Sequence, residues 1–192
     1  MTETATAVTR TIDAREVPLP GTYAIDTSHT QVGFVVRHLM VSKVRGRFTD
    51  FSGTVTVGER PEDSSVEVSV ELASVDSGDD KRDGHLRSAD FFNTDEHPTM
   101  TYTSTSVKPR GDTDWIVEGN LTALGVTKPV TLEVSFEGAS LDPWGGTRIG
   151  FSADGEINRD DFGVSWNQAL ESGGVVVGKK VTLDIEAEAI KE

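Results

Sequence analysis

Apolar and polar residues alternate with a period of two along much of this chain. The pattern is strictest in residues 66–72, 130–136 and 181–189, where apolar side chains occupy every second position. Side chains of a β-strand point alternately to its two faces, so each segment predicts a strand with one apolar and one polar face. Weaker alternation predicts further strands at residues 22–26, 32–38, 43–57, 99–107, 115–123 and 147–157. Together these segments predict an antiparallel all-β domain.

The phase of the alternation changes inside the segment 43–57. Apolar residues and glycines occupy even positions up to Phe48 and odd positions from Phe51 onward. A strand with such a slip must bulge or bend between the two phenylalanines. Bent strands with glycines let a sheet close on itself, and closure removes exposed edges. We therefore expect a β-barrel, with an open sandwich as the alternative.

Two segments lack the alternation. Residues 1–17 are polar and rich in threonine, which predicts a disordered arm in front of a single folded domain at residues 18–192. Residues 77–92 predict a short helical insertion. Ser77 would cap this helix, and Asp79 and Asp80 would lie in its first turn, where backbone N–H groups favour negative charge.

Composition excludes several classes of function. The 192 residues include 32 Asp and Glu against 18 Lys and Arg, for a formal net charge of −14, and no cysteine. So acidic a chain lacks the cations that drive non-specific binding to nucleic acid, and an anionic membrane repels it. The N-terminal residues do not form a secretory signal pattern, and no stretch approaches the roughly 20 apolar residues of a membrane span. We expect a cytoplasmic protein without stable membrane insertion.

The four histidines do not have the spacing of a short zinc motif. His29 and His38 would meet only through folding, with Asp26 nearby. We expect instead that His29 bonds turn backbone and that His38 is a hydrogen-bonded inner residue at a strand end. No metal, other cofactor or catalytic residue is predicted, since the chain also lacks the common nucleophile and phosphate-binding motifs.

Two clusters of charged residues have alternative interpretations. Arg82 and His85, with Asp83 between them, either contact the polar head of a ligand or tie the helical insertion to the barrel. The segment 43–47 has basic residues at every second position, opposite the inward residues of the same strand. It is either a solvated outer face or a docking patch for an acidic partner or lipid head groups.

Four motifs, in order, resemble the YceI-like family of lipocalin-like, polyisoprenoid-binding proteins. They are YAIDTSHTQVGF with VRH and GRF (residues 23–48), SVDSG with RDGHLRSADFF (74–92), GNLTALGVTKPV (119–130) and RDDFG (159–163). The resemblance implies an eight-stranded antiparallel barrel with a short helical insertion, which carries, stores or sequesters a long apolar amphiphile such as a polyisoprenoid or isoprenoid quinone. An enzyme acting on a lipid-like substrate in the same barrel is the alternative. Relatives also suggest a homodimer.

Alternation identifies the residues that would face the interior of such a barrel. The alternation alone predicts that these residues fill a solid core, whereas the resemblance favours a cavity in which they contact the ligand. The expected ligand-binding set is Phe34, Val36, His38, Phe48, Val55, Val68, Val70, Met100, Tyr102, Leu121, Leu132, Val134, Phe136, Ile149, Phe151 and Val177, with Val117 on the same face.

Overall fold

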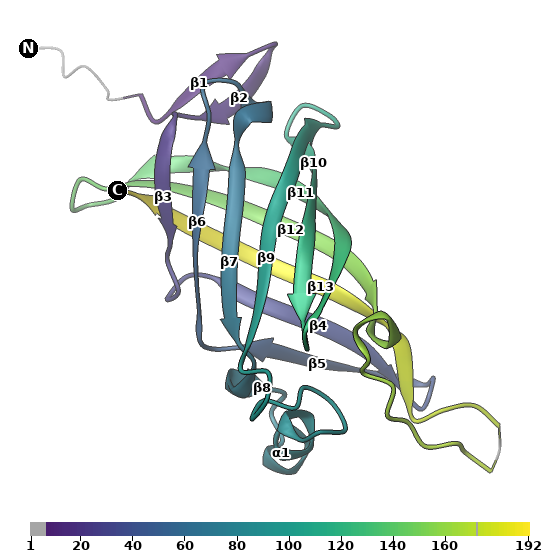
Figure 1. Cartoon of the computed structure of the whole chain (residues 1–192). Coiled ribbons are helices and arrows are strands. Elements are labelled where there is room, and N and C mark those ends of the chain that lie inside the picture. Colours follow the sequence, from purple (N-terminus) through teal and green to yellow (C-terminus); the bar gives the residue numbers. More distant parts are fainter. Residues whose placement is uncertain (1–6, 172) are drawn as a thin grey trace, which may run out of the picture.

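The computed structural model describes residues 7–171 and 173–192 and consists mainly of β-strands (Figure 1). None of its helices is long and apolar enough to cross a membrane. The elements, in chain order, are β1 (Thr9–Ile12), β2 (Arg15–Pro18), β3 (Gly21–Ile25), β4 (Gln31–His38), β5 (Ser42–Phe48), β6 (Phe51–Val57), η1 (Pro61–Asp63), β7 (Ser65–Glu71), η2 (Leu72–Ser74), β8 (Val75–Asp76), α1 (Asp80–Arg87), β9 (Thr99–Pro109), β10 (Asp114–Ala123), β11 (Val126–Leu141), β12 (Thr147–Asn158), η3 (Arg159–Phe162) and β13 (Val177–Lys191).

Eight of these strands form a closed ring. The hydrogen-bonded order is β12-β11-β10-β9-β7-β6-β3-β13, and β13 pairs back with β12 along residues 180–190. Every pairing is antiparallel, which confirms the predicted eight-stranded antiparallel barrel. Beyond the ring, the sheet branches at β13: its residues 189–191 pair with β3, whereas residues 177–186 pair with β4. The branch continues through β5 to β8.

The phase slip in segment 43–57 marks the end of one strand and the start of another. β5 ends at Phe48 and β6 begins at Phe51. Both rings are buried in one cluster with Val70, Leu72 and Val75. The segment is therefore two strands joined by a sharp corner, which lets both phenylalanines point inward.

The N-terminal arm departs from its prediction. Residues 9–18 form the hairpin β1–β2 at one end of the barrel (Figure 1), so the predicted disorder is wrong for this part, while residues 1–6 lie outside the described residues. The hairpin is fixed to the barrel rather than free in solvent. Arg15 Nε donates to the carbonyl of Gly111 at 2.7 Å, and Val17 is 3% exposed. These contacts supply the burial that a polar, threonine-rich arm would otherwise lack.

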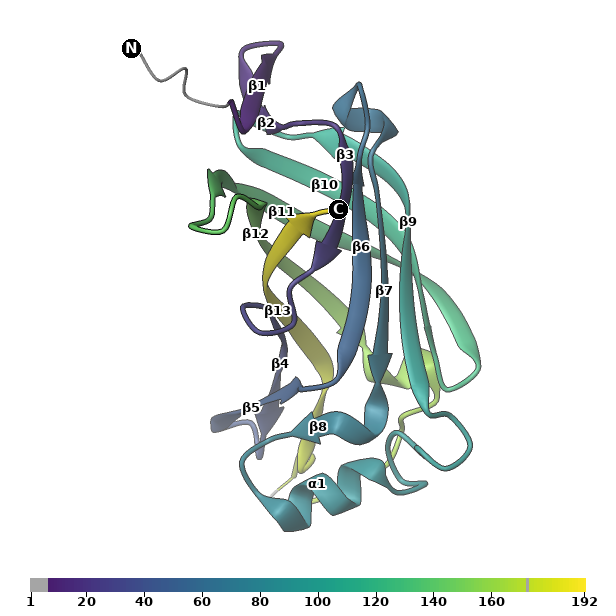
Figure 2. The same cartoon turned by 90° about the vertical axis from the view of Figure 1, so that its left-hand side faces the viewer.

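The predicted helical insertion is α1, at the opposite end of the barrel from the β1–β2 hairpin (Figure 2). Its cap is not the predicted Ser77. Asp79 takes that role, because its carboxylate accepts the N–H of Arg82 at 2.9 Å. Ser77 serves the helix differently: its backbone N–H donates to the buried carboxylate of Asp83 at 2.9 Å. The insertion is thereby tied to the chain that leads into it.

Candidate ligand-binding cavity

A cavity with a volume of about 250 Å³ lies inside the barrel. All eight ring strands contribute to its wall, together with β4 and β5. At about 10–15 Å³ for each water-sized group, the cavity has room for roughly 17–25 such groups, or a chain of about 20 carbon atoms. Most of the lining side chains are valine, leucine, isoleucine, phenylalanine or alanine. Such a space suits a flexible hydrocarbon chain.

Most of the residues expected to face the interior line this cavity. They are Phe34, Phe48, Val55, Val68, Val70, Met100, Tyr102, Val117, Leu121, Leu132, Val134, Phe136 and Phe151.

Four residues of the expected set do not line the cavity, because they lie too far along their strands. His38 pairs directly with Val177 where β4 and β13 extend past the lumen, and Val36 lies on the same part of β4. Ile149 is fully buried in a filled part of the core that also contains Tyr23. These four side chains therefore lie off the cavity wall, and their contact with a ligand stays a prediction.

Sequence reasoning also missed parts of the wall. Leu183, Ile185 and Ala187 line it from β13, and their strict alternation with polar residues was a usable signal. The N-terminal hairpin adds Arg10 and Val17. No signal pointed to these two, because the segment looked disordered.

The polar groups on the wall are largely satisfied within the fold. The hydroxyl of Tyr102 donates toward the carbonyls of Val117 and Val130, at 3.2 and 3.3 Å. Burial raises the pKa of Tyr102 to about 12, so the phenol is neutral at physiological pH. The hydroxyl of Thr30 binds the backbone of Glu188, accepting its N–H at 3.0 Å. These hydroxyls leave the wall effectively apolar.

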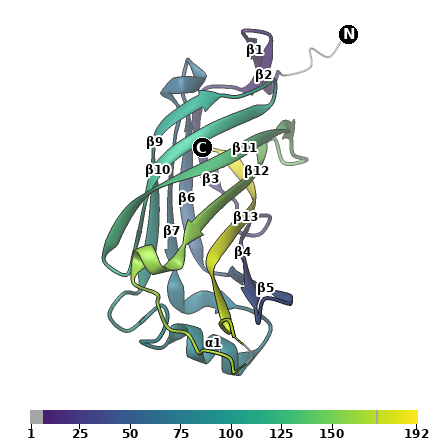
Figure 3. The ribbon, with the colours of Figure 1, turned by 90° about the vertical axis from the view of Figure 1, so that its right-hand side faces the viewer.

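The two candidate head-group residues lie outside the cavity wall. Arg82 Nε donates to Ser77 Oγ at 2.7 Å, and its Nη2 donates to the Ser77 carbonyl at 2.8 Å. His85 lies 2.8 Å from a carboxylate oxygen of Asp90, and its ring packs edge-on against Trp166 with centroids 4.7 Å apart. Trp166 belongs to the segment that follows η3 and passes α1 (Figure 3). Both side chains are therefore bonded within the fold and away from the cavity wall.

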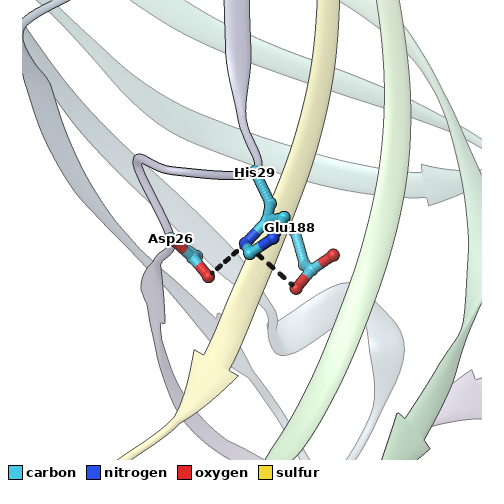
Figure 4. Close-up of side chains that lie close together, drawn as sticks. All are labelled: Asp26, His29 and Glu188. Carbon is cyan, nitrogen blue, oxygen red and sulfur yellow. Dashed lines mark hydrogen bonds and ion pairs between the residues drawn. The ribbon is translucent and has the colours of Figure 1, made fainter. Parts of the chain in front are cut away.

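A second polar cluster lies on the outside of the barrel, where Asp26, His29 and Glu188 converge (Figure 4). His29 Nδ1 is 2.8 Å from Asp26 Oδ2 and 4.0 Å from Glu188 Oε1. One ligand atom from each residue lies within 4.8 Å of the others, a spacing that a metal ion would accept. His38, the other histidine considered for a metal site, is absent from this group.

Arg148 accounts for the cluster without a metal ion. Its Nη1 donates to Asp26 Oδ2 at 2.7 Å and to Glu188, and its Nε donates to Asp142 Oδ2 at 3.0 Å. Hydrogen bonds from the Ser28 hydroxyl, Arg148 and His29 hold the pKa of Asp26 well below its usual range. The guanidinium binds both carboxylates of this group and offsets part of their charge, so we interpret the group as an ion-pair cluster.

Comparison with known proteins identifies the family. The model of the YceI-like domain matches residues 23–189. The chain belongs to the YceI-like domain family. Protein YceI of Escherichia coli O17:K52:H18 (strain UMN026) is 44% identical over 173 residues, which cover 88% of this chain and 87% of that protein.

Solved structures share the fold of this YceI-like protein. A YceI protein of Campylobacter jejuni is 30% identical, with a TM-score of 0.70 over 87% of this chain and 96% of the other. Burkholderia cenocepacia BcnA reaches a TM-score of 0.75 at 22% identity, covering 85% and 98% of the two chains. A polyisoprenoid binding domain from Saccharophagus degradans reaches 0.67 at 19% identity, covering 88% and 98%.

The YceI-like match begins at Tyr23, whereas the cavity wall begins at Arg10. The β1–β2 hairpin thus precedes the matched residues and also contributes to the cavity wall. Arg10, Val17 and Pro18 are the hairpin residues on the wall.

Proposed function

We propose that this YceI-like protein binds a long apolar amphiphile, such as a polyisoprenoid, an isoprenoid quinone or a similar lipid, inside its barrel. The observation that carries the proposal is the cavity inside the barrel, with its almost wholly apolar wall. The protein would act as a carrier, store or sequestering agent for a molecule that water does not dissolve.

The energetics of burial support this ligand class. Each buried carbon contributes about 0.8 kcal/mol, so one prenyl unit of about five carbons contributes about 4 kcal/mol. Losses of ligand freedom offset part of this gain. Several units remain enough for tight binding without any charged contact. The fold is also that of a domain from Saccharophagus degradans described as polyisoprenoid binding, which supports the same class of ligand.

Extraction of the purified protein with organic solvent, followed by mass spectrometry, tests the proposal. We expect a prenyl lipid or quinone in stoichiometric amount, and a rise in melting temperature when the delipidated protein is reloaded with it. A variant with a filled lumen, Ala187→Phe, purified from the same host, controls for lipid that adheres to the surface. The proposal fails if no amphiphile copurifies and none of the prenyl lipids tested raises the melting temperature.

A further inference from the structure

Among the side chains that line the described cavity, Arg10 is the one with an ionised group. Its Nη2 donates to the carbonyl of Gly58 at 2.6 Å, and its Nη1 lies 3.3 Å from Glu59 Oε2. Its Nε is buried and has no hydrogen-bond partner. A buried donor without an acceptor destabilises the folded state, so the structure around Arg10 is incomplete without one.

Glu59 does not satisfy this guanidinium. Its side chain is 86% exposed, and an ion pair so open to water contributes little. Because Arg10 lies on the cavity wall, a stronger acceptor inside the barrel competes with Glu59 for this guanidinium. A phosphate or carboxylate binds a guanidinium through paired, charge-assisted hydrogen bonds, which are about twice as strong as neutral ones.

The wall near Arg10 is more polar than the rest of the cavity. Ser64 and Ser65 line it there, and Ser64 Oγ accepts the N–H of Gly58, the residue whose carbonyl holds Arg10. The part of the wall formed by Phe34 and Phe48, which belong to strands next to α1, is aromatic and aliphatic. The β1–β2 hairpin and α1 lie at opposite ends of the barrel (Figure 2). Arg10 and the two serines therefore make the hairpin end of the cavity its polar end.

We propose that Arg10 binds an anionic head group, phosphate or carboxylate, of the ligand whose hydrocarbon chain fills the barrel. This rests on the proposed function and extends it to the head group. The residue belongs to the β1–β2 hairpin, which precedes the residues that the YceI-like domain model matches.

The test compares two ligands of equal chain and different head group, geranylgeranyl phosphate and geranylgeraniol, on the full-length protein. The variants are Arg10→Gln and the control Arg15→Gln. Arg15 lies in the same hairpin but bonds the Gly111 carbonyl and does not line the cavity. We expect wild type and Arg15→Gln to prefer the phosphate by about tenfold or more, and Arg10→Gln to lose that preference while keeping its affinity for the alcohol.

The outcomes separate the two proposals. If wild type binds neither probe, the proposed function fails. If it binds both but Arg10→Gln retains the phosphate preference, or weakens both ligands equally, the assignment of Arg10 is overturned while the binding function stands. Melting temperatures without ligand identify any variant that has lost its fold, and Arg10→Lys, which keeps the charge but lacks Nε, then replaces Arg10→Gln.

An independent observation concerns the turn between β4 and β5. Residues 39–41 are apolar and exposed, with Met40 55% and Val41 82% accessible to solvent. Around them, Arg37, Lys43 and Arg45 are also exposed, and none of these three forms an ion pair within the described residues. The cations of the predicted outer patch thus flank an apolar tip, although the chain as a whole has a net charge of −14.

We infer that this β4–β5 tip docks on an anionic lipid surface. Exposed apolar side chains insert between head groups, and each Lys or Arg near such a surface adds electrostatic attraction to the anionic lipids. An acidic protein partner would match the charges but leave the apolar tip without an apolar environment. Screening confines the repulsion by distant acidic residues to about one Debye length, roughly 8–10 Å, so the local cations dominate at contact.

Co-sedimentation with phosphatidylglycerol vesicles tests this inference. We expect wild type to bind phosphatidylglycerol vesicles at low salt and to be released from them as the salt concentration rises. It should not bind phosphatidylcholine vesicles. Met40→Ser/Val41→Ser should lose binding. Trp144→Ser, which removes an apolar side chain that is 85% exposed elsewhere, should not. Absence of wild-type binding at low salt, or equal loss in both variants, overturns the inference.

Discussion

Filling the lumen gives the sharpest test of where the ligand chain lies. Ala187 lines the cavity from β13 and is directly paired with Phe151 of β12. Ala187→Phe adds a phenyl ring inside the barrel, while Glu186→Phe adds the same ring one residue away on the exposed outer face. The two variants add the same ring at adjacent positions of β13 and differ in the side of the sheet that they change.

The magnitude follows from the cavity. A phenyl ring takes about six of the roughly 17–25 water-sized positions available, slightly more than one prenyl unit. Excluding about five ligand carbons costs up to about 4 kcal/mol, or roughly a thousandfold in affinity. A flexible chain recovers part of this loss by shifting toward the polar end. We therefore expect Ala187→Phe to weaken geranylgeraniol by at least about tenfold.

Competition against a bound apolar fluorescent dye measures the affinities. Geraniol, with half the chain length, should be nearly unaffected by Ala187→Phe because it does not need the lost space. Glu186→Phe should bind both alcohols as wild type does. The reasoning is refuted if Ala187→Phe weakens both alcohols equally, if it leaves geranylgeraniol unchanged, or if Glu186→Phe reproduces its effect.

The remaining predictions concern stability and titration. Gly119→Ala should destabilise the barrel by about 1–3 kcal/mol in denaturant titrations, because its Cβ would lie 2.4 Å from Cζ of Tyr102. Gly84→Ala should stabilise by about 0.5–1 kcal/mol, because the added methyl meets nothing within 4 Å on α1. Burial raises the pKa of Tyr102 to about 12, so ultraviolet titration of the folded protein should show no tyrosinate from this residue near pH 10; its appearance there contradicts the burial. Hydrogen bonds lower the pKa of Asp26 in the folded protein. The ionised carboxylate therefore contributes to folding stability above about pH 4, and this contribution is lost as the pH falls further. The melting-temperature difference between wild type and Asp26→Asn should narrow below that pH, and a constant difference would exclude the carboxylate as its source.

Much of the barrel was predictable because period-two alternation is a local property. The strands around residues 66–72 and 115–123 have their apolar faces inward as expected. The phase slip between Phe48 and Phe51 located the corner between two strands. The β1–β2 hairpin was missed because its stability comes from contacts with distant carbonyls, those of Gly58 and Gly111, which composition does not reveal.

The sequence predicted which face of the sheet each candidate site residue occupies, but not how far along the barrel that residue lies. Alternation says which face of the sheet a side chain occupies, and this was enough for Val68 and Leu132. It does not say how far along the barrel the lumen extends. Val36 and Ile149 have the same inward phase as true wall residues, yet one lies past the cavity and the other is packed in solid core. That distinction depends on strand tilt and packing, which are properties of the closed sheet.

The branch point of the sheet shows why the polar cluster on the outside of the barrel exists. β13 pairs with β3 from Ala189 onward and with β4 up to Glu186, so Glu188 falls between the two ladders. Its backbone groups would lack strand partners on this edge. The N–H of Asp26 donates to the Glu188 carbonyl at 2.8 Å, and the Glu188 N–H donates to Thr30 Oγ1 at 3.0 Å. The loop between β3 and β4 therefore completes the ladder where the strands separate.

Arg148 then reinforces the same branch point from β12. It bridges Asp26, Glu188 and Asp142, so one guanidinium joins the loop after β3, the strand β13 and the β11–β12 turn. These elements meet only after the ring has closed, which is why no spacing in the sequence indicates the cluster. The position of the cluster in the fold accounts for its residues without a metal ion. The carboxylates and His29 stabilise a junction at which the sheet itself provides too few hydrogen bonds.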